Sequence, residues 1–69
     1  MGDGVSQRGF WDVTLGFRDP EHGNNYCTVG CHISFSTAPT AEDAIRTLRE
    51  WRKIGVPLVT VSVEMRDPL

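Results

Sequence analysis

Residues that could bind a metal or carry redox chemistry gather in the segment 26–32 (YCTVGCH). It holds both cysteines of the chain, Cys27 and Cys31, followed at once by His32. Thiolate sulfur and imidazole nitrogen are the ligands that zinc prefers in proteins, and a cysteine pair is also the basis of dithiol redox chemistry. A small metal or redox protein is therefore one functional hypothesis.

The spacing of the two cysteines argues against this chemistry. The segment alternates like a strand, and residues four apart in a strand are separated by about 13 Å between Cα atoms. A disulfide needs roughly 4.4–6.8 Å, and one tetrahedral zinc cannot span the gap either. Only a bulge at Gly30 would bring the thiols together, so packing of Cys27 and Cys31 in an apolar face is the favoured interpretation.

Other catalytic signals are weak. His22 falls in a predicted loop and His32 on a predicted polar strand face, and neither has an evident acid–base partner in a pocket. Ser34 and Ser36 resemble ordinary strand-surface residues, and there is no glycine-rich phosphate loop. The sequence therefore favours a protein that is not an enzyme and that uses no cofactor and no metal.

The charge pattern of interest is a basic row on a predicted helix. Arg46, Arg49 and Lys53 share one stripe, with Arg52 beside them. Such a row can contact phosphates or an acidic protein, and nucleic-acid binding through these four residues is the second hypothesis. Glu42 and Glu50 lie within pairing distance, so a solvated, ion-paired face is favoured. The formal net charge of −2 also argues against binding nucleic acid by bulk charge.

Two alternating runs predict a hairpin before this helix. Residues 10–18 place Trp11, Val13, Leu15 and Phe17 on one face, and residues 26–36 place Cys27, Val29, Cys31, Ile33 and Phe35 on one face. The segment 19–25 (DPEHGNN) is dense in turn formers. Residues 1–9 are glycine-rich and poor in apolar side chains, which predicts a flexible N-terminal tail.

The run 39–65 predicts a capped helix that leads into an apolar strand. Thr40 is the expected N-cap, with Asp43 completing a variant of the capping box. The predicted apolar stripe consists of Ala41, Ala44, Ile45, Leu48 and Trp51. We expect a helix of about 15 residues that ends with Gly55 in the left-handed conformation and Val56 packed back on Trp51. The last strand spans 58–66, with Val59, Val61, Val63 and Met65 facing inward.

Together these elements predict an α+β fold. The elements follow the order β-β-α-β along the chain, and the three strands form a single-layer sheet with one helix packed on one face. Together they make up a single domain over residues 10–69. A right-handed crossover allows the strand orders 2-1-3 and 1-2-3, and the first is favoured because split arrangements are common in small α+β domains.

Self-association is the expected way to complete this small core. One helix is about 10 Å wide while three strands span about 14 Å, so part of the apolar sheet face is left uncovered. The last strand carries valines and no lysine, which would leave an edge open to pairing. We expect a homodimer through this edge or through the uncovered face, unless Phe10, Trp11 and the tail cover it.

No apolar run approaches the ~20 residues of a membrane span and residues 1–10 do not resemble a signal peptide, so the expected location is the cytoplasm.

Residues 30–48 (GCHISFSTAPTAEDAIRTL) resemble antitoxins of the HicB type. In that family a hairpin strand with Gly-Cys precedes a helix that opens with Thr-x-Glu-Glu-Ala, and Thr40, Glu42, Asp43 and Ala44 correspond to this opening. The gap between Cys31 and Thr40 is longer than in the family, and no separate DNA-binding segment is evident. The resemblance implies a small interaction protein. A non-enzymatic interaction or regulatory module that acts through protein–protein contacts is accordingly the first functional hypothesis.

Overall fold

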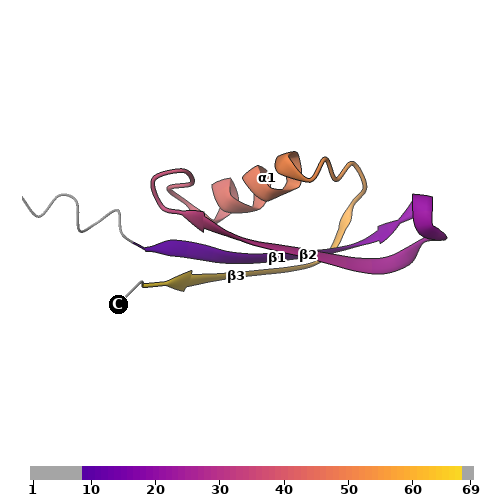
Figure 1. Cartoon of the computed structure of the whole chain (residues 1–69), viewed down its shortest axis with the longest axis horizontal. Coiled ribbons are helices and arrows are strands. Elements are labelled where there is room, and N and C mark those ends of the chain that lie inside the picture. The colour runs from indigo at the N-terminus through magenta and orange to yellow at the C-terminus, as the bar shows by residue number, and fades with distance from the viewer. Residues whose placement is uncertain (1–8, 68–69) are drawn as a thin grey trace, which may run out of the picture.

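The chain folds as one helix laid on one face of a three-stranded antiparallel sheet (Figure 1). The computed structural model describes residues 9–67. Its elements are β1 (Phe10–Asp19), the 3₁₀ turn η2 (Pro20–His22), β2 (Asn25–Ser34), α1 (Ala41–Trp51) and β3 (Leu58–Arg66). The strand order is β2-β1-β3. The predicted α+β fold and the order 2-1-3 are thus confirmed, and the order 1-2-3 is excluded.

The central strand β1 joins the apolar faces of both neighbours. Val13 lies opposite Cys31 of β2 and opposite Val63 of β3, so the alternating apolar positions of the three strands fall on one face. This face carries the core beneath α1. The buried apolar residues are Trp11, Val13, Leu15, Ile33, Ala38, Ala44, Leu48 and Ile54.

Gly9 is the first residue that the structure describes. The prediction of a flexible tail over 1–9 falls outside the described residues except at its last position. Gly9 is buried, and its carbonyl accepts a hydrogen bond from the Phe35 amide at 3.2 Å. The chain is therefore already part of the packed structure one residue before β1.

The register of β3 shifts once. Gly16 lies opposite Thr60, and the next residue, Phe17, lies opposite Leu58, so Val59 is the extra residue of a bulge. From Thr60 to Arg66 the pairing is regular. Val61, Val63 and Met65 lie opposite Leu15, Val13 and Trp11 and face the helix side as predicted. Val59 does not continue that row, because the bulge interrupts the alternation.

The helix begins as predicted. Thr40 is the N-cap of α1, and its Oγ1 accepts a hydrogen bond from the Asp43 amide at 3.1 Å. The Asp43 carboxylate pairs with Arg46 one turn further along. This cap satisfies one of the amides that the first turn leaves without a helical partner.

The helix ends earlier than the sequence indicates. It spans 11 residues and stops at Trp51, and Lys53, not Gly55, takes the left-handed conformation with a φ of 54°. The Lys53 amide donates to the Glu50 carbonyl at 3.2 Å and the Ile54 amide to the Arg49 carbonyl at 3.0 Å, which is a Schellman motif. The prediction for Gly55 was wrong because the turn at Lys53 places Ile54 in the core.

The early turn also changes the role of Trp51. Its side chain is 56% exposed, so its assignment to the buried stripe was wrong. Ala44 and Leu48 are the helix residues that are buried, and Ile54, which follows the helix, is the buried apolar residue at its C-terminal end. Val56 packs against the same core cluster. Trp51 is left at the surface as a result.

The second strand ends at Ser34 rather than Ser36. The Thr37 and Ala38 amides both donate to the Ser34 carbonyl, at 3.1 and 3.0 Å, which turns the chain away from the sheet. This turn presents the Ala38 carbonyl to Trp11, whose Nε1 donates to it at 2.6 Å in the core. No helix within residues 9–67 is long and apolar enough to cross a membrane.

Candidate interaction surface

Most of the exposed large apolar side chains of the sheet lie along β3. Val59, Val61 and Met65 are 54%, 48% and 67% exposed, respectively. In the part of the chain that the structure describes, β3 pairs only with β1, so its other edge has no hydrogen-bonding neighbour. We call these three residues and this edge the β3 surface. Exposed apolar side chains on an open sheet edge are typical of association sites.

The size and place of α1 explain this exposure. The helix of 11 residues is about 16 Å long and about 10 Å wide. Its buried residues Ala44 and Leu48 join the core that contains Val13 and Leu15 of the central strand. The helix therefore covers the apolar row of β3, Val61, Val63 and Met65, only in part. Of these three residues, only Val63 packs against the core cluster, and it is half-buried. The sequence predicted an uncovered apolar patch, and the fold places it on β3.

The opposite face of β3 is polar and tied to its neighbours. Arg66 Nη2 contacts Glu64 Oε1 at 2.6 Å and Asp12 Oδ2 of β1 at 3.4 Å. Thr60 Oγ1 is hydrogen-bonded to the hydroxyl of Tyr26 at 2.7 Å. The strand is thus held to the sheet on one face, while Val61 and Met65 stay exposed on the other.

Two residues of the predicted basic row are engaged in local structure. Arg46 pairs with Asp43, and Arg49 donates from Nε to the Ile54 carbonyl at 3.2 Å and from Nη2 to the Val56 carbonyl at 3.0 Å. Arg49 therefore fastens the chain that follows the helix. The sequence did not reveal this role, because the acceptors are main-chain atoms of a loop whose path depends on the tertiary structure.

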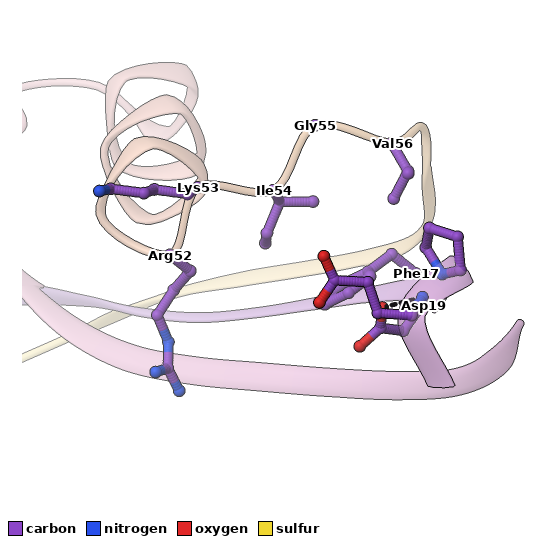
Figure 2. A pocket seen from close by; sticks show the side chains of 9 residues that line it. Phe17, Asp19, Arg52, Lys53, Ile54, Gly55 and Val56 are labelled. Carbon is purple, nitrogen blue, oxygen red and sulfur yellow. Dashed lines mark hydrogen bonds between the residues drawn. The ribbon is translucent and has the colours of Figure 1, made fainter. Parts of the chain in front are cut away.

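Arg52 and Lys53, the other two basic residues, line a pocket of about 280 Å³ at the C-terminal end of α1 (Figure 2). The far wall is the tip of the hairpin, with the carboxylates of Asp19 and Glu21, and Phe17, Ile54 and Val56 supply apolar lining. None of the ion pairs among residues 9–67 joins the two walls. The nearby carboxylates reduce the attraction of this site for phosphates, since like charges repel.

The cysteines lie apart, as their spacing predicted. Pairing between β1 and β2 runs without a register shift, so there is no bulge at Gly30. Cys27 and Cys31 are free and half-buried, and their thiols lie 3.5 Å from the Asn25 and His32 carbonyls, respectively. Among the described residues no group of three His, Cys, Asp or Glu side chains is arranged to hold a metal ion.

The two histidines occupy different surfaces. His32 lies on the polar sheet face, with Nε2 3.7 Å from Asp12 Oδ1 and its ring centroid 4.7 Å from that of Phe10. His22 lies at the hairpin tip, with Nδ1 2.6 Å from Asp19 Oδ2. The hydrogen bond to Asp19, helped by the charge of that carboxylate, raises the pKa of His22 above 6.5. The hydrogen bonds from His22 and from the Glu21 amide lower the pKa of Asp19 below 3.8.

Comparison with known proteins finds no protein-family model, no curated protein and no solved structure that matches this chain. The resemblance of residues 30–48 to HicB-type antitoxins receives no support from these comparisons.

Proposed function

We propose that this protein is a non-enzymatic interaction module that works as a homodimer through the β3 surface. The observation that carries the proposal is the row of apolar side chains on an open strand edge, where Val61 and Met65 are 48% and 67% exposed. Removing such surface from water gains about 25 cal/mol of free energy per Å² buried, which favours association.

The size of the chain supports the same proposal. A domain of 69 residues buries only about 60% of the surface that its unfolded chain exposes, so its core alone gives marginal stability. A second copy adds apolar burial without lengthening the chain. Nucleic-acid binding is not favoured, because Arg46 and Arg49 are engaged and Arg52 and Lys53 share a pocket with two carboxylates.

A cytoplasmic location belongs to this proposal. Cys27 and Cys31 are free thiols, which is the form that a reducing compartment maintains.

Light scattering after size exclusion, over a dilution series in the micromolar range, tests the proposal. We expect twice the chain mass of 7.7 kDa. Val61→Lys places a charge in the β3 surface and should yield a folded monomer, as judged by circular dichroism. Thr28→Lys adds the same charge to an exposed position of the opposite edge strand and should remain dimeric. A wild-type chain that is monomeric at every concentration would sink the proposal.

A further inference from the structure

The regular part of β3 is complementary to a second copy of itself. When two antiparallel strands pair within one sheet, side chains directly opposite each other lie on the same face. The apolar face of β3 carries the odd-numbered residues Val61, Val63 and Met65. If the apolar faces of the two copies are to lie on the same side of the joined sheet, odd-numbered residues must pair with odd-numbered residues. A register shift of one residue would place the apolar side chains of one copy beside the polar side chains of the other.

A two-fold axis through Val63 satisfies this condition along the whole regular segment. On the apolar face Val63 meets Val63 of the second copy, and Val61 meets Met65 twice. On the polar face Thr60 meets Arg66 and Ser62 meets Glu64. The two most exposed apolar side chains of this regular segment, Val61 and Met65, thus cover each other, and no like charges stand directly opposite.

The neighbouring registers pair the side chains of the two strands less favourably. An axis through Ser62 sets Met65 opposite Val59, the residue displaced by the bulge, and sets Arg66 opposite Leu58. An axis through Glu64 places two carboxylates directly opposite each other, which is destabilising. With the axis at Val63 the two Glu64 side chains are diagonal neighbours, and each is already paired with Arg66 of its own chain at 2.6 Å.

We infer that the dimer forms by antiparallel pairing of β3 with β3 of a second copy, with the two-fold axis at Val63. This joins the two three-stranded sheets into one of six strands and rests on the homodimer proposed above. The other edge strand, β2, is less suited to this pairing. Its apolar-face residues Cys27, Val29 and Cys31 are already half-buried, so covering them removes less surface from water.

Single cysteines introduced along β3 test the register. The background is a chain with Cys27→Ala and Cys31→Ala, which leaves no native thiol. Val63→Cys stands directly opposite itself at about 5 Å between Cα atoms, within the range of a disulfide. Ser62→Cys is the diagonal control at about 7–8 Å, and Val61→Cys lies about 14 Å from its own copy. After oxidation with oxidised glutathione and non-reducing electrophoresis, we expect a covalent dimer at least tenfold more abundant for Val63→Cys than for either control.

The outcomes separate the register from the dimer itself. A light-scattering dimer in which Ser62→Cys or Val61→Cys couples best overturns the register while the homodimer stands. A wild-type chain that oxidises to a covalent dimer through Cys27 and Cys31 places the interface on β2 and overturns the use of β3. A monomeric background chain together with a monomeric wild type overturns both proposals.

Discussion

The hydroxyl of Tyr26 is hydrogen-bonded to Oγ1 of Thr60 at 2.7 Å, so the two edge strands touch across the central strand. This contact is made over Gly16, where a Cβ atom would overlap both Thr60 Oγ1 and the Tyr26 ring and hydroxyl. The glycine thus leaves the room in which an aromatic side chain covers the exposed backbone of β1.

Replacing Gly16 by Ala should displace Tyr26 and break its bond to Thr60. We expect a loss of about 1 kcal/mol in the free energy of unfolding, the usual contribution of such a hydrogen bond, measured by urea denaturation. Gly30→Ala is the matched control on the same face, since its Cβ would meet the Val13 carbonyl at an ordinary 3.4 Å. Equal stability of Gly16→Ala and Gly30→Ala would contradict the proposed role of Gly16.

The two tryptophans should respond differently to replacement by phenylalanine. Trp11 is 9% exposed and donates from Nε1 to the Ala38 carbonyl at 2.6 Å, whereas Trp51 is 56% exposed. Trp11→Phe leaves a buried carbonyl without a donor and should cost about 1–3 kcal/mol. Trp51→Phe should change the free energy of unfolding by less than about 0.5 kcal/mol, as for most surface substitutions. A Trp11→Phe chain as stable as the wild type would show that the Ala38 carbonyl is satisfied by other means.

Replacing Lys53 by Gly should stabilise the fold. Lys53 holds a φ of 54°, a conformation that costs a residue with a Cβ roughly 1–2 kcal/mol and that glycine adopts freely. We expect a gain of about 1 kcal/mol in thermal or urea unfolding.

Gly55→Ala is the companion test at the site that the sequence favoured for the helix end. Gly55 does not have a positive φ, and a Cβ there would meet nothing within 4 Å. The substitution should be neutral or stabilising by up to about 1 kcal/mol, because it reduces the freedom of the unfolded chain. Marked destabilisation would place the left-handed turn at Gly55 after all.

The hairpin tip should respond to pH through Asp19 and His22. The pKa of His22 is raised, so its stabilising contribution is complete below pH 6.5 and is lost as the pH rises through its folded value. The pKa of Asp19 is lowered, so its contribution is complete above pH 3.8 and is lost as the pH falls through its folded value. Both contributions are therefore present between about pH 4 and 6.5.

An NMR titration of the His22 ring checks this pair. In the wild type we expect a midpoint above 6.5, and in Asp19→Asn a midpoint that falls toward 6.5 because the charged acceptor is removed. His22→Gln identifies the resonance. A midpoint that Asp19→Asn leaves unchanged would mean that the 2.6 Å contact does not persist in solution.

The elements that depend on neighbouring residues could be predicted from the sequence. The predicted bounds 10–18 and 58–66 match those of the strands closely, and Thr40 caps the helix as expected. These features depend on side-chain parity and on a hydrogen bond between residues three apart, both of which are local. The separation of Cys27 and Cys31 follows from the same strand geometry.

Features that depend on contacts between residues distant in the sequence could be recognised only from the tertiary structure. The helix turns at Lys53 because Ile54 fills the core, and Trp51 is exposed for the same reason. Arg49 is drawn to carbonyls of the loop before β3, and Gly16 meets side chains from both edge strands. The elements and the presence of uncovered apolar surface could thus be predicted from residue patterns alone. The tertiary structure placed that surface on β3, because the strand order makes β3 an edge and the short helix covers the centre of the sheet.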